Sequence, residues 1–348
     1  MADTVQGRRS GRPALRPPGQ RHSGQRPAGP RAANQSAQAR AAAFIRRHKI
    51  APYLLLAPAL AGIALVLLWP LVQVVLYSFQ NLGLPQLTGA APTQWAGLSN
   101  FSTTFADPEF WLSLRNTVLF AVVVVPLTLV LGTLVGLLLN RLGRKMAAFV
   151  SAAALLAWAT PPTAGAVLFY WMFNPDGGLV DWALSKMPHW LVGSTNWAQY
   201  NWTTTGAVQA YTVVTLLVLW TSFPFIAVTV LAGLKTVPAE LYEAARIDGA
   251  TPWRAFRRVT FPLLKPIFLV LLLLSVIWDF NVFNQTYLIT GFPGNQNEYN
   301  LSLYIYDKAF GFPPSYGLGG ALALIFTAIL LVVTVGYVRS SVRQGALT

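Results

Sequence analysis

The sequence has 348 residues, of which 54% are hydrophobic and only 10% are charged, and its formal net charge is +14. Soluble domains contain about 25% charged residues, so this composition excludes an ordinary water-soluble protein. The absence of cysteine excludes disulfides and thiolate metal sites.

The first 48 residues form a basic segment rich in Arg, Pro, Gly and Gln. Residues 1–50 contain eleven Lys and Arg residues and one acidic residue, Asp3. Almost no bulky apolar side chain precedes Phe44, so burial cannot offset the entropy cost of ordering this segment. We expect residues 1–48 to be a disordered cytoplasmic tail that fixes the topology. Its attraction to nucleic acid or anionic lipid is the weaker alternative, and we expect no nucleic-acid partner.

Six stretches of predominantly apolar residues follow, each near the length of about 20 residues that a helix needs to cross a bilayer. They lie near 52–79, 117–139, 147–173, 207–234, 263–289 and 318–338. The sequence therefore predicts an all-α membrane protein with about six transmembrane helices. Prolines inside these stretches, such as Pro161 and Pro162, are expected to kink the helices, because neighbouring helices can satisfy the freed carbonyls.

The basic residues predict the orientation of these spans. They cluster before the first span, between the second and third, between the fourth and fifth, and after the sixth. Cytoplasmic loops carry the excess of Lys and Arg. Both termini and the loop 235–262 are therefore expected on the cytoplasmic side.

This loop has the pattern of two short helices joined by a glycine turn. Pro238 suits the first turn of a helix and Gly249 suits its left-handed end, while Glu240 and Glu243 lie near the positive end of the helix dipole. Thr251 is a predicted N-cap, and Pro262 is expected to close the second helix. An ordinary basic loop needs no such pattern.

The segment EAARIDG followed by VTFP resembles the EAA loop of binding-protein-dependent ABC transporter permeases. Five residues match the family pattern in register, and Val259 and Phe261 replace its usual Ile and Leu. The matching residues are Glu243, Ala244, Ala245, Gly249 and Pro262. Over roughly 50–340 the chain is similar to the sugar-uptake permeases, including those for maltose, glycerol phosphate and trehalose.

The resemblance implies a type I importer bundle, with 49–348 as the permease domain, in a bacterial cytoplasmic membrane. It implies three kinds of partner besides membrane lipid: a second permease in a heterodimer, two cytoplasmic ATPase subunits and an extracytoplasmic solute-binding protein. The loop would then be a coupling helix seated in a cleft of the ATPase. The residues expected there are Glu240, Glu243, Ala244, Ala245, Asp248, Gly249, Ala250, Arg254 and Pro262.

No catalytic or metal site is predicted in the chain itself. A phosphate-binding loop needs a Gly-Lys pair, and the sequence contains none. The three histidines, His22, His48 and His189, have no metal-ligand spacing. ATP and Mg²⁺ are therefore expected in the partner ATPase subunits, with no cofactor in this chain.

The fifth apolar stretch is interrupted by the polar segment WDFNVFNQTY. An ionised Asp near the bilayer centre costs about 2.5–3.5 kcal/mol, so such residues usually face a bundle interior or a watery cavity. Aromatic faces beside amide groups suit a sugar. Hydrogen bonding to neighbouring helices, or a position of Asp279 at the outer interface, remains open. The residues expected along the substrate path are Asp279, Asn281, Asn284, Gln285, Tyr287 and Tyr170.

Two other functions are compatible with six spans. An ATPase-independent secondary transporter or channel would need a relay of intramembrane ionisable groups, and Asp279 alone fits that description. A membrane anchor or scaffold would instead use the basic tail to hold lipid or nucleic acid. The specific substrate is not encoded in any pattern we find.

Overall fold

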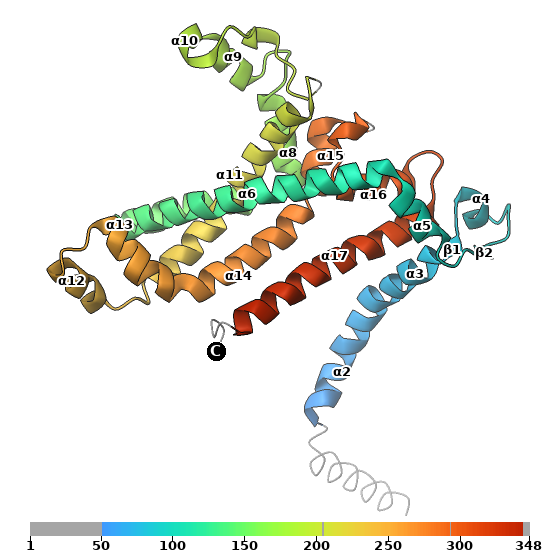
Figure 1. The fold of residues 1–348 in the computed structure, drawn as a ribbon, viewed down its shortest axis with the longest axis horizontal. Helices are drawn as coiled ribbons and strands as arrows, with labels where there is room; N and C mark the ends of the chain where they lie inside the picture. Colours follow the sequence, from blue (N-terminus) through green and yellow to red (C-terminus); the bar gives the residue numbers. More distant parts are fainter. Residues whose placement is uncertain (1–50, 204, 293, 344–348) are drawn as a thin grey trace, which may run out of the picture. The chain divides into compact units, whose positions relative to one another are not determined.

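The computed structural model describes residues 51–203, 205–292 and 294–343, most of them helical (Figure 1). The predicted disordered tail, 1–48, lies outside these residues. The described chain divides between Leu68 and Trp69 into two compact units.

The described part of the first unit is a single apolar helix. Helix α2, Ala51–Ile63, continues into the π-helical turn η1, Ala64–Leu68. Its large side chains are exposed, and Leu55 and Leu65 are 80% and 72% accessible. A helix that is apolar all round suits a surrounding of lipid or other membrane helices.

The second unit contains seven of the longer helices and several short elements. The longer helices are α3 Trp69–Ser78, α6 Pro108–Arg141, α7 Arg144–Trp158, α8 Pro162–Met172, α11 Ala207–Leu234, α14 Phe261–Phe280 and α17 Tyr316–Arg343. The short helices are α4 Leu84–Leu87, α5 Ser99–Ala106, α9 Leu179–Ser185, α10 His189–Val192, η2 Trp197–Gln199, α12 Ala239–Ile247, α13 Pro252–Ala255, η3 Phe256–Thr260, α15 Phe283–Thr290, η4 Gln296–Glu298 and α16 Leu301–Phe310. Strands β1, Gln80–Asn81, and β2, Gln94–Trp95, pair antiparallel.

The prediction of membrane-spanning helices is confirmed, and their number nearly agrees with the six predicted. Among the described residues, five helices are long and apolar enough to cross a membrane, and the bent pair α7 and α8 makes a sixth candidate. The five are Leu55–Ser78, Pro108–Arg141, Ala207–Leu234, Pro252–Phe280 and Tyr316–Arg339. The fold is therefore the predicted all-α membrane bundle.

The third predicted span, 147–173, is broken where a kink was expected. Helices α7 and α8 meet at an angle of 90°. Pro161 is extended, with ψ at 137°, and Pro162 starts α8. Two successive prolines remove two backbone donors and clash with the preceding turn, so α7 ends at Trp158. The Thr160 hydroxyl donates to the Leu156 carbonyl at 2.9 Å and satisfies one of the orphan acceptors there.

Helices α6 and α11 approach closely because two glycines lie one turn apart on α6. A Cβ atom built on Gly132 would lie 2.6 Å from the Cβ of Ile226, and one on Gly136 would lie 2.8 Å from the Ala227 carbonyl oxygen. Small residues at this spacing let helix backbones pack tightly in membranes. Val230 and Leu234 of α11 also share a buried cluster with Leu264 and Leu271 of α14.

The fifth predicted span, 263–289, is too long at its C-terminal end. Helix α14 ends at Phe280, and Asn281 caps it with φ at −103°. The carbonyl of Val282, just after the break, accepts hydrogen bonds from Asn300 Nδ2 at the start of α16, at 2.7 Å, and from Thr286 Oγ1, at 2.9 Å. A long-range side chain thus contributes to the hydrogen bonding at the break, and Asn284, Gln285 and Tyr287 belong to the separate helix α15.

An ion-pair cluster joins the start of α6 to α16. Lys308 Nζ lies 3.0 Å from Glu109 Oε2 and 3.4 Å from Asp107 Oδ2, and the Tyr304 hydroxyl donates to Asp107 Oδ2 at 2.7 Å. Burial acts to raise the pKa of Asp107, but the hydrogen bond from Tyr304, that from the Glu109 amide and the nearby Lys308 outweigh it, so the pKa is lowered. The acidic partners raise the pKa of Lys308 despite its burial. Both groups therefore favour their charged forms.

Candidate functional site

The loop between α11 and α14 contains the helix and glycine turn that the sequence predicts. Helix α12 starts at Ala239, one residue after Pro238, and Asp248 caps its end. Gly249 has φ at 71°. Its amide donates to the Arg246 carbonyl, and the Ala250 amide donates to the Ala245 carbonyl at 2.9 Å. This is a Schellman ending, which requires a left-handed residue and hence favours glycine.

Most of the family-matched residues of α12 are accessible to a partner. Glu243, Ala244, Asp248 and Gly249 are exposed, and Ala245 and Ala250 are half-buried. Ile247 is 87% exposed and Leu241 is 42% exposed. Leu241, Ala244 and Ile247 follow one another at spacings of three, so they form an apolar strip on one helical side. The sequence prediction missed Ile247, although this spacing could have indicated it.

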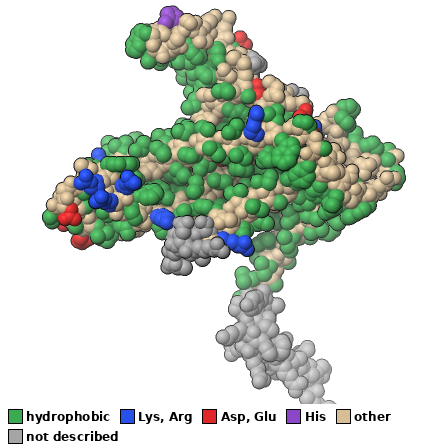
Figure 2. Space-filling model, in the orientation of Figure 1, with side chains coloured by type: hydrophobic (Ala, Val, Ile, Leu, Met, Phe, Trp, Pro, Cys, Tyr) green, Lys and Arg blue, Asp and Glu red, His purple; other side chains and the backbone are tan. Residues whose placement is uncertain are grey.

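The second half of the loop begins as predicted. The Thr251 hydroxyl accepts a hydrogen bond from the Arg254 amide at 3.3 Å, and Pro252 is the first residue of α13. The side chains of Arg254, Arg257 and Arg258 are exposed. Lys and Arg side chains gather at the α12–α13 end of this unit, beside a few acidic ones (Figure 2).

The prediction that Pro262 closes this second helix is wrong. Residues 252–280 form one continuous span. The π-helical segment η3 precedes the proline, and the Phe261 amide donates to the Phe256 carbonyl five residues back. A π-helical turn shifts the hydrogen-bond register and so accommodates the missing amide and the bulk of the ring. Pro262 thus lies at the start of α14, and the loop is directly continuous with the membrane helix.

Two sets of contacts fasten the loop to the helices. The Tyr242 hydroxyl lies 3.0 Å from the hydroxyl of Thr260, which is buried. Four aromatic rings follow one another at centroid distances of 5.6, 6.3 and 5.4 Å. They belong to Trp253, Phe256, Phe261 and Phe268. A displacement of α12 therefore reaches α14 through packed side chains as well as through the backbone.

The polar residues near the end of α14 border a cavity of about 420 Å³. The structure brings Asn281, Asn284 and Gln285 together there, although the helix break places them on two elements. Its other lining residues come from α11, α14 and the α7–α8 bend: Leu217, Thr221, Ser222, Ile277, Trp278, Trp158, Thr160 and Pro162. The sequence prediction missed the contribution of the bend, which only the tertiary fold brings near.

Three predicted path residues lie elsewhere. Asp279 is only 4% exposed and does not line this cavity, and its Oδ2 has no hydrogen-bond partner among the described residues. The Tyr287 ring stacks on Phe292 at 5.4 Å. Tyr170 borders a separate cavity of about 230 Å³ with Asn174, Asp176 and Asn201. The predicted set is therefore divided among four environments.

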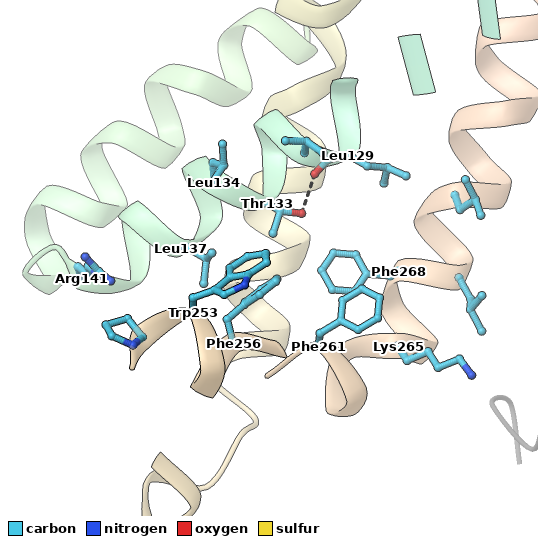
Figure 3. Close-up of a pocket in the computed structure, with 14 residues that line it drawn as sticks. Leu129, Thr133, Leu134, Leu137, Arg141, Trp253, Phe256, Phe261, Lys265 and Phe268 are labelled. Atoms are coloured by element: carbon cyan, nitrogen blue, oxygen red, sulfur yellow. Dashed lines mark hydrogen bonds between the residues drawn. The ribbon is translucent and has the colours of Figure 1, made fainter. Parts of the chain in front are cut away.

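A further cavity has a different character. It measures about 650 Å³ and lies between α6, α13 and α14 (Figure 3). Apart from Thr133, Arg141 and Lys265, its lining is aliphatic and aromatic, whereas a sugar needs several hydrogen-bonding groups around its hydroxyls. The smaller cavity bordered by Asn281 is therefore the better candidate for a polar solute. No cluster of three potential metal ligands occurs among the described residues.

Comparisons with known proteins agree with this geometry. Residues 128–344 match the family described as binding-protein-dependent transport system inner membrane component. The chain is 40% identical to the diacetylchitobiose uptake system permease protein DasB of Streptomyces coelicolor, over 88% of this chain and 90% of that protein. It is 31% identical to the trehalose/maltose transport system permease protein MalF of Thermococcus litoralis, over 82% and 92%.

Solved structures support the fold. A chain of a bacterial alginate ABC transporter, solved in complex with an alginate pentasaccharide-bound periplasmic protein, superposes with a TM-score of 0.69. The identity is 20%, and the match covers 86% of this chain and 96% of that one. The resemblance drawn from the EAA loop is confirmed, and the alternative of an ATPase-independent transporter or channel is not supported. The chain belongs to the family of inner membrane components of binding-protein-dependent transport systems, and it is a multi-pass permease subunit of an ABC importer.

Proposed function

We propose that this permease forms half of the translocation path for a mono- or disaccharide or a related polyol, and that the loop 235–262 couples the path to a separate ATPase. The observation that carries the proposal is the physical continuity between an exposed helix, α12, and a membrane helix, α14, whose other end borders a polar cavity. Movement imposed on α12 can thus alter the helix beside the cavity.

The chemistry of the cavity supports a sugar as substrate. Asn281, Asn284 and Gln285 supply amide donors and acceptors, and Trp278 and Trp158 supply aromatic faces. Amides match sugar hydroxyls, and indole rings match the apolar C–H faces of a pyranose. The relatives point the same way, because their names specify diacetylchitobiose, sulfoquinovosyl glycerol and trehalose or maltose as transported solutes.

The exposed face of α12 supports ATPase docking. Glu243, Ala244 and Gly249 present a low-profile surface, and Ile247 supplies an apolar knob beside it. Apolar anchors surrounded by polar residues are typical of protein interfaces. Glu240, Ala245, Asp248, Ala250 and Arg254 complete the proposed contact. Pro262 lies at the head of α14, so its role is to transmit movement and not to touch the partner.

The proposed assembly contains a second permease, two cytoplasmic ATPase subunits and an extracytoplasmic solute-binding protein. The loop and both termini face the cytoplasm, as the basic residues predict. ATP and Mg²⁺ act in the ATPase subunits, and this chain holds no cofactor of its own. ATP binding then shifts the population between states open to one side or the other.

Transport by the reconstituted assembly tests the proposal. The chain is combined in proteoliposomes with its partner permease, the ATPase and the loaded binding protein, and sugar uptake and ATP hydrolysis are measured together. We expect Glu243→Gln to lower uptake at least several-fold while the variant stays in the membrane. Arg144→Gln changes an exposed charge of α7 and should have no effect. Wild-type uptake by Glu243→Gln and by Gly249→Ala would contradict the coupling role of the loop.

A further inference from the structure

The aromatic and aliphatic cavity between α6, α13 and α14 is not used by the proposed transport path. On α6 it is lined by Leu129, Val130, Thr133, Leu134, Leu137 and Arg141. On α14 the lining residues Phe261, Lys265, Phe268 and Leu272 recur every three or four positions, so they share one helical side. Each helical side therefore carries apolar residues and one cation.

The interior of this groove offers little to a polar ligand. The Thr133 hydroxyl donates to the Leu129 carbonyl of its own helix at 2.6 Å, so its one donor is engaged. Val130 and Leu134 are 58% and 59% exposed, and Phe261 is 46% exposed. Figure 3 shows the rings of Trp253, Phe256, Phe261 and Phe268 in a row facing the α6 side chains. The lining of the groove therefore suits the hydrocarbon chains of a lipid.

The two cations lie toward the loop end of the groove. Arg141 is the last residue of α6, and Lys265 lies in the second turn of α14. In Figure 3 they flank the row of rings on opposite sides. From Leu129 to Arg141 the lining covers twelve residues, or about 18 Å at 1.5 Å per residue. The hydrocarbon of one bilayer leaflet is about 15 Å thick. The groove thus has the length of one acyl layer.

We propose that this groove binds an anionic phospholipid of the cytoplasmic leaflet. Its acyl chains lie along α6 and α14, and its phosphate lies at the basic rim formed by Arg141 and Lys265. Basic pockets between membrane helices on the cytoplasmic side are suited to anionic head groups. The placement in this leaflet rests on the proposed function, which puts the loop in the cytoplasm. Because Trp253 and Phe256 belong to the loop 235–262, the bound lipid also contacts and stabilises that loop.

Lipid retention by the assembled transporter tests this proposal. The complex is exchanged into nanodiscs of phosphatidylglycerol or of phosphatidylcholine with identical acyl chains, and lipids that remain bound after release are counted by native mass spectrometry. We expect wild-type complex to retain phosphatidylglycerol preferentially. Removing the charges with Arg141→Gln and Lys265→Gln should reduce that preference about five-fold for each cation, since one cation near a lipid surface contributes about 1 kcal/mol.

Matched variants distinguish lipid binding in the groove from a general effect of charge and from loss of folding. Arg144→Gln with Lys145→Gln removes two cations that do not line the groove and should leave the preference unchanged. Leu134→Trp fills the groove and should lower retention of both lipids. Copurification of the ATPase verifies that each variant still assembles.

Two results would overturn the lipid assignment. One is equal retention of both lipids by the wild-type complex. The other is an efficient cross-link from Thr133→Cys to a partner protein, which is readable because the native chain has no cysteine, and which would place a protein segment in the groove. Failure of sugar uptake with intact lipid preference would instead contradict the proposed function alone.

Discussion

The hydroxyl groups of Tyr242 and Thr260 lie 3.0 Å apart and join the exposed helix α12 to the head of the membrane helix α14. Tyr242 is half-buried, and Thr260 is 2% exposed. The two residues are separated by the flexible glycine turn at Gly249 and by the turn of α13. The hydrogen bond therefore ties α12 to the start of α14, so the loop can move as a unit when a partner displaces α12.

Tyr242→Phe removes this hydrogen bond and keeps the ring. Because the Thr260 hydroxyl would then be buried without that partner, we expect the loop to loosen from α14 by about 1 kcal/mol. Loaded binding protein should stimulate ATP hydrolysis less than in the wild type, and uptake per ATP hydrolysed should fall. Both are measured in proteoliposomes.

Tyr200→Phe is the matched control for this variant, because it makes the same change in the segment between α10 and α11, far from the loop. It should leave the ratio of uptake to hydrolysis unchanged. If Tyr242→Phe also leaves that ratio at the wild-type value, the hydroxyl contact has no part in coupling.

Gly249 provides a second prediction, because its φ of 71° is strained for residues with a Cβ atom. A Cβ built there meets no atom within 4 Å, so the cost of Gly249→Ala is conformational, about 1–2 kcal/mol. We expect weaker ATPase copurification and lower uptake. Gly249→Asn adopts this conformation more readily and should retain more of both. If both variants lose copurification and uptake equally, the cause is a steric clash with the partner and not backbone strain.

Local features of the fold were predictable from sequence because their causes are local. The Thr251 cap and the left-handed Gly249 each depend on residues within a few positions. The apolar spans depend on composition alone. The break after Phe280 was not predictable, since the Val282 carbonyl just after it accepts a hydrogen bond not only from the nearby Thr286 but also from Asn300, eighteen positions away.

The candidate cavity was predictable only in part for the same reason. The sequence predicts Asn281, Asn284 and Gln285 along one substrate path, and they do share one cavity. A helix break, and not the continuous span predicted over 263–289, brings them there. The 90° bend between α7 and α8 adds Trp158 and Pro162 to the lining, and no periodicity in the sequence relates that bend to α14.

The polar cavity gives a third prediction. Asn284→Ala removes an amide from its lining, and loss of one hydrogen bond to a sugar costs about 1 kcal/mol, or roughly five-fold in affinity. We expect the KM for sugar uptake to rise by this factor, with ATPase assembly unchanged. Asn297→Ala alters an exposed amide that does not line the cavity and should have no effect. An unchanged KM in Asn284→Ala would remove Asn284 from the path.

The pH dependence of the Lys308 cluster gives the last prediction. Lys308→Met breaks the ion pairs with Asp107 and Glu109 and should lower the thermal midpoint of the detergent-solubilised protein, by an amount equivalent to about 1 kcal/mol because the groups are partly exposed. The pKa of Asp107 is lowered from 3.8, so its stabilisation is present above that pH and is lost as the pH falls through the lower folded value.

The pKa of Lys308 is raised from 10.5, so its stabilisation is complete below that pH and is lost as the pH rises through the higher folded value. The difference in midpoint between wild type and Lys308→Met should therefore be constant from about pH 5 to about pH 9 and should shrink at both extremes. Lys186→Met removes an exposed cation outside the cluster and should lower the midpoint little at any pH. A wild-type advantage that disappears near pH 7 would mean that these ion pairs do not hold α6 to α16.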